Sequence, residues 1–181
     1  MPRHVAFLRA INVGGNRLVA MEQLRKSFAR LGFKDVETFI ASGNVVFSSA
    51  SRDPLKLARQ IEKQLEADLG FDVDTFVRTT EEVVAIAKYQ PFAAKAIGAA
   101  AGFNVGFLSE PLPPASCKAL EAMGTGIDAF HANGREWYWL CREKQSNSKV
   151  SNGAIEKALK VRSTLRGMNT IVRLAAKVIG Q

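Results

Sequence analysis

The sequence predicts an α+β protein made of two related halves. The segment LGFKDVETFI at 31–40 returns as LGFDVDTFV at 69–77 when one residue is skipped, and the opening VAFLRA at 5–10 is echoed by VGFLSE at 105–110. A helix that ends in glycine and leads into a strand therefore occurs twice, and a similar strand opens each half. The predicted element order is that of a ferredoxin-like βαββαβ sheet, followed by an abbreviated βαββα copy.

The first half has well-marked boundaries. Apolar residues recur at spacings of three and four from Met21 to Leu31, which predicts a helix that Gly32 ends. The next helix has Asp53 as its cap and Pro54 at its first position. In order, the predicted elements are a strand at 5–8, a helix at 21–31, strands at 35–41 and 45–48, a helix at 54–69 and a strand ending at 79.

The second half follows a connection, which we expect to contain a helix from Thr80 to about Gln90 and then an alanine- and glycine-rich passage. After it come a strand from 105, a helix at 114–123, a hairpin of 127–131 and 136–141, a helix capped by Ser151 or Asn152, and a last helix after Gly167 and Asn169. The predicted domains are an N-terminal subdomain at 1–79, a linker at 80–101, and a C-terminal subdomain at 102–181 with a basic helical end.

The strand EWYWLC at 136–141 is apolar on both faces, with Trp137, Trp139 and Cys141 on one and Tyr138 and Leu140 on the other. Such a strand can be a stacking platform for nucleic-acid bases or a buried central strand. Because neither half contains the aromatic signature of RNA-recognition sheets, the pattern favours the buried strand. Cys117 and Cys141 are far apart in the sequence, which predicts free thiols.

Composition indicates a soluble globular chain of one domain or two small ones, with 47% hydrophobic and 23% charged residues in 181. We find neither a charged leader before an apolar segment nor an apolar run of membrane-spanning length, so we expect a cytoplasmic protein with no membrane partner. The last 40 residues hold nine Lys or Arg against two Asp or Glu, which is +7 of the net charge of +8. This asymmetry points to an acidic partner, although a merely solubilising tail is the alternative.

A glycine loop after the first strand is the first candidate anion site. Gly14 and Gly15 allow a tight turn before a helix, where backbone N–H groups can face an anion. Further donors come from Arg9, Asn12, Asn16 and Arg17. The competing interpretation is a plain turn, since the phosphate-loop and dinucleotide glycine patterns are absent.

Polar residues elsewhere extend this candidate set. Ser42 and Asn44 lie in a turn at a strand end, where they form the turn or contact a ligand. Lys149, Asn152 and Arg166 lie near the starts of C-terminal elements and could contact acidic groups. A solvated basic face is the ordinary alternative for such lysines.

Patterns for catalysis are missing from the sequence. His4 and His131 are the only histidines and neither has metal-ligand spacing, so we predict no metal and no cofactor. His131 falls in the predicted hairpin, where a strand residue is favoured over a general base. No catalytic residue is assigned, and whether the chain is an enzyme stays open.

The chain resembles the bacterial domain-of-unknown-function family numbered 1697. The resemblance is carried over nearly the whole chain by LRAINVGG at 8–15, SGNVVF at 42–47, SKVSN at 148–152, TLR at 164–166 and NTIVRL at 169–174. It implies two ferredoxin-related subdomains and no particular activity. This sequence departs from the family pattern at Ala10, where glycine is expected, at Ala20, where proline is usual, and at Gly167, where asparagine is expected.

Three functions follow as hypotheses. The first is non-catalytic binding of an anionic ligand, with nucleic acid leading, through the glycine loop and the basic C-terminal segment. The second is an enzyme that acts on a phosphorylated or carboxylated small molecule in a cleft between the subdomains. The third is a protein-interaction module that uses a sheet edge or the aromatic strand. The sequence leaves the oligomeric state open.

Overall fold

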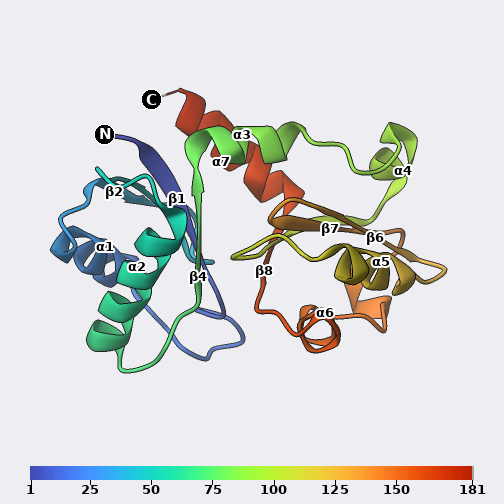
Figure 1. Cartoon of the computed structure of the whole chain (residues 1–181), viewed down its shortest axis with the longest axis horizontal. Helices are drawn as coiled ribbons and strands as arrows, with labels where there is room; N and C mark the ends of the chain where they lie inside the picture. Colours follow the sequence, from blue (N-terminus) through green and yellow to red (C-terminus); the bar gives the residue numbers. More distant parts are fainter. Residues whose placement is uncertain (181) are drawn as a thin grey trace. The chain divides into compact units, whose positions relative to one another are not determined.

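The computed structural model describes residues 1–180, and the chain groups into two compact units (Figure 1). The first unit contains Met1–Val84 and Leu174–Gln181, and the second contains Ala85–Arg173. The domain limits expected from the sequence, 1–79 and 102–181 with a linker at 80–101, remain a prediction. The two compact units of the structure have other boundaries, which fall inside the helices α3 (Thr80–Lys88) and α7 (Met168–Ile179).

The first unit holds a four-stranded antiparallel sheet with the strand order β2-β3-β1-β4. Its elements in chain order are β1 (Arg3–Leu8), α1 (Met21–Arg30), β2 (Lys34–Thr38), β3 (Asn44–Ser48), α2 (Pro54–Leu69) and β4 (Thr75–Thr79). The two inner strands are β1 and β3, paired with Ala6 opposite Val45 and His4 opposite Phe47. The predicted elements of the first half are therefore all present.

Helix α2 shows how local sequence fixes a boundary. The Asp53 carboxylate accepts hydrogen bonds from the backbone N–H groups of Leu55 and Lys56, and Pro54 opens the helix. Gly70 ends it with φ 80°, a left-handed conformation that suits glycine.

The core of the first unit lies between the sheet and the helices α1 and α2, which run side by side in Figure 1. Leu24 and Phe28 of α1 are fully buried, as are Leu57 and Ile61 of α2. The apolar residues that recur at spacings of three and four in the sequence are thus the ones that face the core.

The second unit holds another four-stranded antiparallel sheet, with the strand order β6-β7-β5-β8. Its elements are α4 (Ala94–Ala99), β5 (Gly102–Phe107), α5 (Pro114–Ala122), β6 (Asp128–Asn133), β7 (Glu136–Cys141), a 3-10 turn (Gln145–Asn147), α6 (Asn152–Leu159) and β8 (Thr164–Gly167). The prediction of an abbreviated second copy is wrong, because β8 supplies a fourth strand that pairs with β5. The predicted connection also contains a short helix, α4, that the alanine-rich sequence did not indicate.

The strand β7 is buried on both faces, so the interpretation as a core strand is confirmed. Trp137, Trp139 and Cys141 pack with α5 and α6, and Tyr138 and Leu140 on the other face are no more than 5% exposed. The indole N–H of Trp137 donates to Ser163 Oγ at 2.8 Å. Both cysteines are free, as the sequence predicted, with Cys117 half-buried and Cys141 buried.

The two faces of this sheet are covered differently. In Figure 1, α5 and α6 lie on one side of the strands and α4 on the other. Helix α4 buries none of its residues, whereas α6 buries Ile155, Glu156 and Leu159. The sheet is therefore closely packed on the α5 and α6 side and loosely covered by α4.

Candidate functional site

The glycine loop of the first unit folds back on itself after β1. Five of its residues have positive φ: Ala10 (57°), Asn12 (53°), Gly14 (58°), Gly15 (76°) and Arg17 (48°). The exposed glycines form the tip of a small turn in which the Asn16 N–H donates to the Val13 carbonyl. No atom lies within 4 Å of a Cβ added at either glycine, so backbone conformation, rather than lack of space, favours glycine there.

Asn12 holds this loop in place. Its Oδ1 accepts from the Val19 N–H at 2.8 Å, and its Nδ2 donates to the carbonyls of Val19 and Ala41 at 3.1 and 3.0 Å. Both amide protons and the amide oxygen are therefore engaged within the protein. These contacts give Asn12 a structural role that explains its place in the motif without a ligand.

The Ser42 to Asn44 turn lies against the end of β1. The Leu8 N–H donates to the Gly43 carbonyl at 2.8 Å, and buried Asn44 Nδ2 donates to the Phe39 carbonyl and to Ser42 Oγ. Through Asn12 and Ala41, the structure brings the glycine loop and this turn together within the first unit. Asn44 thus acts as a turn former, the ordinary alternative for a polar residue at a strand end.

The two arginines of the glycine loop lie beside acidic residues that follow α2. Arg9 Nη1 is 3.9 Å from Asp74 Oδ2, and Arg17 Nη2 is 3.9 Å from Asp72 Oδ1. Arg17 also donates to the Asp72 carbonyl and lies 5.1 Å above the Phe71 ring. The two carboxylates offset the positive potential that an anion would need at this end of the first unit.

Three of the predicted site residues lie in the second unit. Asn152 begins α6 after the capping Ser151, and its Nδ2 donates to Glu156 Oε1 and to the Ser163 carbonyl. Arg166 is 7% exposed and donates to Thr164 Oγ1 at 2.7 Å and to the Leu165 carbonyl. Burial lowers the pKa of Arg166 to about 10, so the guanidinium stays charged at neutral pH.

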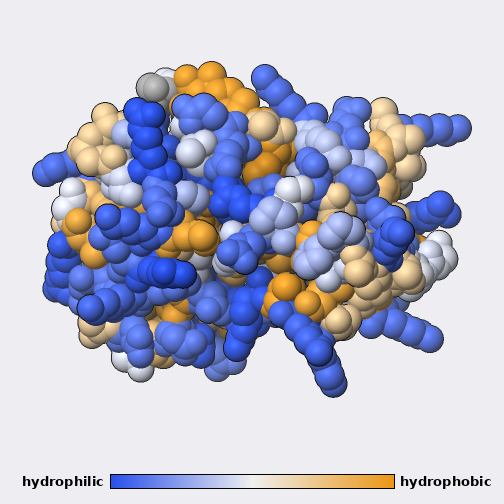
Figure 2. Space-filling model, viewed as in Figure 1, coloured by the Kyte–Doolittle hydropathy of each residue, from blue (hydrophilic) through white to orange (hydrophobic). Residues whose placement is uncertain are grey.

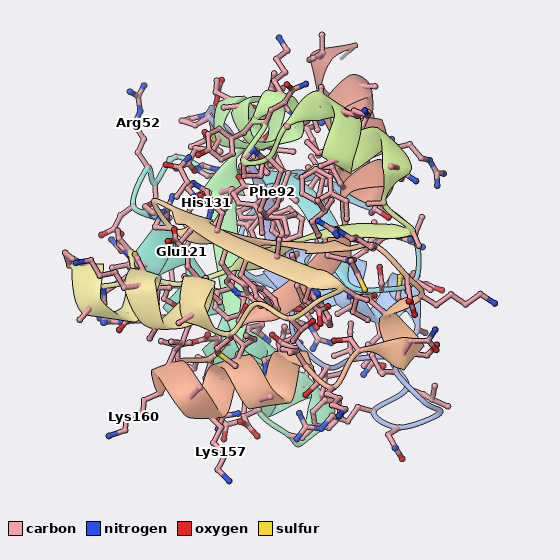
Figure 3. All side chains as sticks on the ribbon, turned by 90° about the vertical axis from the view of Figure 1, so that its right-hand side faces the viewer. Arg52, Phe92, Glu121, His131, Lys157 and Lys160 are labelled. Atoms are coloured by element: carbon pink, nitrogen blue, oxygen red, sulfur yellow. The ribbon has the colours of Figure 1, made fainter. Side chains whose placement is uncertain are left out.

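Exposed lysines surround α6. Lys149 precedes the helix, Lys157 lies in its last turn, and Lys160 ends it in a left-handed conformation with φ 54°. Figure 3 shows Lys157 and Lys160 extending from α6 away from the rest of the unit. Within residues 1–180 none of these three ammonium groups makes an ion pair, so the charge of this α6 lysine set faces solvent.

The structure also brings together three polar side chains, Tyr89, Glu121 and His131, for which no sequence motif predicts a contact. Tyr89 Oη lies 3.0 Å from His131 Nε2, and His131 Nδ1 lies 3.5 Å from Glu121 Oε1. When Nδ1 carries the imidazole proton toward Glu121, the Tyr89 hydroxyl donates to Nε2. Figure 3 shows Glu121 and His131 on neighbouring elements.

Sequence spacing gave no signal for this group. Tyr89 and His131 are 42 residues apart in the sequence. They meet only because the fold brings β6 next to the segment that follows α3. Tyr89 also lines a pocket of about 790 Å³ with the polar residues Lys88, Asn104, Gln145 and Asn169. A hydroxyl in contact with an imidazole, beside a polar pocket, is an arrangement suited to proton transfer.

In the part of the chain that the structure describes, histidine, cysteine and carboxylate side chains form no group of three that could hold a metal ion. No helix among residues 1–180 combines the length and apolar character that crossing a membrane requires.

The fold and these sites define a class: an α+β protein with two four-stranded antiparallel sheets and, in the described residues, seven α-helices. The chain belongs to the family described as Protein of unknown function (DUF1697), whose family model matches residues 1–138. The match confirms the resemblance drawn from the LRAINVGG and SGNVVF motifs.

A solved structure has a similar fold. It is that of the conserved bacterial protein SP0830 from Streptococcus pneumoniae, with a TM-score of 0.73 and 24% sequence identity. The alignment covers 97% of each chain. A search of the curated proteins finds no match.

Proposed function

We propose that this protein binds an anionic ligand, that nucleic acid is the leading partner, and that the α6 lysine set of the second unit makes the principal contact. We also infer that both units are ferredoxin-like subdomains, since each has the order βαββαβ and the same sheet arrangement. The observation that carries the functional proposal is the exposure of Lys149, Lys157 and Lys160 without ion-pair partners among residues 1–180.

Charge supports a nucleic-acid partner over a neutral one. The segment from Arg142 onward holds nine basic and two acidic residues. Figure 2 shows that long hydrophilic side chains stand out at several places on the visible face of the molecule. Lysines that reach solvent neutralise phosphates and release counterions, a contact that does not depend on base identity. The aromatic side chains of β7 are buried, so the proposed contact is with the phosphate backbone instead of stacked bases.

Binding of a fluorescent oligonucleotide, measured by anisotropy across a salt series, tests the proposal. Replacing Lys149, Lys157 and Lys160 by glutamine should weaken binding to every sequence. It should also reduce the slope of log K against log salt by roughly two to three. The matched control replaces Lys34, Lys56 and Lys63 of the first unit by glutamine, which removes the same charge from exposed positions.

The results separate cleanly. Salt-dependent binding that only the α6 triple variant weakens supports the proposed surface. Absent binding, salt-independent binding, or an equal loss in both triple variants would reject it.

A second candidate function is an enzyme that acts on a phosphorylated or carboxylated small molecule. The observation that favours it is the contact of Tyr89 with His131 beside the polar pocket of about 790 Å³. A bound ligand raises apparent stability, so a thermal-shift screen of phosphorylated and carboxylated metabolites should reveal a stabilising compound. Turnover of that compound should fall in Tyr89→Phe, which keeps the ring and removes the hydroxyl. A screen without any stabilising compound at millimolar concentration would count against this function.

A further inference from the structure

An apolar pocket of about 700 Å³ lies under α4 in the second unit, separate from the α6 lysine set. Its volume falls in the range of small-molecule sites. Its apolar walls come from the α4 segment and from the ends of β6 and β7: Phe92, Ala96, Ala99, Ile127, Ala129 and Leu140.

The cavity follows directly from the sequence of the covering segment. Residues 93–101, AAKAIGAAA, offer mostly methyl groups, which are too short to fill the space between a helix and a sheet. Helix α4 therefore covers the sheet without burying any of its own residues. On the other face, the large side chains Trp137 and Trp139 fill the equivalent space.

Two cations line this largely apolar pocket. Lys95 comes from α4, and Arg142 follows β7. Both are exposed, and neither side chain has an ion pair or hydrogen bond within the described chain. They line the pocket from two different elements, Lys95 from the covering helix and Arg142 from the residue after β7.

The acid that lines the same pocket makes no ion pair with these cations. Asp128 is 4% exposed, and its carboxylate accepts from Thr125 Oγ1, Trp139 Nε1 and Ser148 Oγ at 2.6 to 2.8 Å. Three donors therefore occupy the carboxylate from within the protein. The pocket therefore combines largely apolar walls with two cations that have no ion pair and one buried carboxylate that is engaged by neutral donors.

We propose that this pocket binds an amphipathic carboxylic acid, a molecule with an apolar body and one carboxylate. The body removes apolar surface from water against the alanine and leucine walls. The carboxylate meets the guanidinium of Arg142, a planar donor that suits it, and the ammonium of Lys95. A nucleic-acid strand matches the pocket poorly, because its charge is distributed along its length and its bases need aromatic or hydrogen-bonding walls.

Octanoate is the probe, and 1-octanol is its neutral control of equal chain length. Isothermal titration calorimetry on the full chain should show octanoate binding about tenfold tighter than octanol, since a hydrogen bond to a charged group contributes more than one to a neutral group. The double variant Lys95→Gln with Arg142→Gln should remove that difference while leaving octanol binding unchanged. The matched control, Lys157→Gln with Lys160→Gln, loses the same charge on α6 and should bind octanoate like the unmodified protein.

Filling the pocket tests its location independently of charge. Ala96→Trp places an indole in the cavity from a helix with no buried residues, so the fold should tolerate it, and octanoate binding should fall at least tenfold. Ala122→Trp, at an exposed alanine of α5 outside the pocket, should leave binding unchanged.

Three results would overturn the proposal: no octanoate binding at millimolar concentration, equal binding of octanoate and octanol, or binding that Ala96→Trp leaves intact. None of them bears on the oligonucleotide experiment, which depends on the α6 lysine set.

Discussion

The inner strands β1 and β5 have matching sequences, but the strands opposite them carry side chains of different size. In the first unit Ala6 of β1 pairs with Val45 of β3. In the second unit Gly106, the matching residue of β5, pairs with Trp137 of β7. The two sheets have equivalent strand orders. The same position in the sheet therefore holds an alanine opposite a valine in the first unit and a glycine opposite a tryptophan in the second.

This difference shows how each core fills its space: a smaller residue on the inner strand is matched by a larger side chain on the strand that pairs with it. We call this compensation the volume exchange. A Cβ built on Gly106 would lie 2.1 Å from Trp137 Nε1, so the indole uses the space that the Ala6 methyl fills in the first unit. The buried indole then needs a polar partner, which Ser163 supplies. The first unit, with no tryptophan, has no such requirement.

The largest expected effect on stability comes from adding a methyl group at Gly106 in the second unit, where Trp137 already fills the space. Gly106→Ala should destabilise it by about 3 kcal/mol or more, because the new methyl must displace Trp137 and break its bond to Ser163. Both tryptophans lie in the second unit, so urea unfolding followed by tryptophan fluorescence reports on it. The reciprocal change, Ala6→Gly, only removes a methyl and should cost about 1 kcal/mol. Equal costs at the two positions would contradict the volume exchange.

A second comparison sets buried Asp128 of the second unit against buried His4 of the first. Asp128→Asn should cost roughly 2 kcal/mol at neutral pH, because a neutral amide cannot accept equally from Thr125, Trp139 and Ser148. Although burial alone raises the pKa of Asp128, these hydrogen bonds hold it below the ordinary 3.8. Its contribution is therefore complete above pH 3.8 and lost as the pH falls through the lowered value. Urea unfolding at pH 7 and pH 3 should show that the variant and the unmodified protein differ less in acid.

His4 should produce a smaller effect at higher pH. It is 1% exposed, and neither ring nitrogen has a hydrogen-bond partner within residues 1–180. Burial lowers the pKa of His4 below 6.5, opposed only in part by the Pro2 backbone and by the carboxylates of Glu81 and Glu82. As the pH falls, His4 is therefore protonated in the unfolded chain at a higher pH than in the folded protein. The free energy of unfolding decreases as the pH drops below 6.5, by at most about 1.4 kcal/mol per pH unit.

The variant His4→Phe tests this dependence. Phenylalanine keeps the stacking that His4 makes with Phe47 and cannot titrate. Hydrogen exchange of β1 amides, after correction for the intrinsic pH dependence of exchange, should report less stability at pH 5.5 than at pH 7 in the unmodified protein. That loss should be smaller in the variant, and an identical pH dependence in both would rule out His4 as its source.

The smallest expected effect concerns the glycine loop. Ala10 has φ 57°, a conformation that glycine adopts without strain, and glycine is the residue the family resemblance leads us to expect there. Ala10→Gly should stabilise the protein by about 1 kcal/mol or less. Ala67→Gly is the control, because Ala67 is an exposed residue inside helix α2, where glycine is less stable than alanine by roughly 0.5–1 kcal/mol. Thermal unfolding of the two variants should shift in opposite directions.

Local sequence signals predicted most of the fold. Helix α2 follows from Asp53, Pro54 and Gly70, residues that act within a few positions of themselves. Strand β8 has no such signal: Thr164–Gly167 is four residues long, contains one large apolar side chain, and becomes a strand through pairing with β5. The fourth strand of the second sheet is therefore formed by pairing with β5, and local sequence does not predict it.

The candidate sites were harder to predict, because they depend on contacts and on empty space. The motif residues Asn12 and Asn44 were recognised, but only the structure shows that their amides bind backbone carbonyls. Tyr89 and His131 meet across 42 residues, a separation at which no spacing rule operates. The pocket under α4 arises from the small size of alanine, whereas the alanine- and glycine-rich composition of this segment predicted only a connection.

The division inside α3 and α7 has a consequence for synthesis. Residues 174–181 group with the first unit although they follow the entire second unit in the chain. Leu174 and Val178 of this segment are buried. During synthesis, the segment that completes the first unit therefore leaves the ribosome after every residue of the second unit.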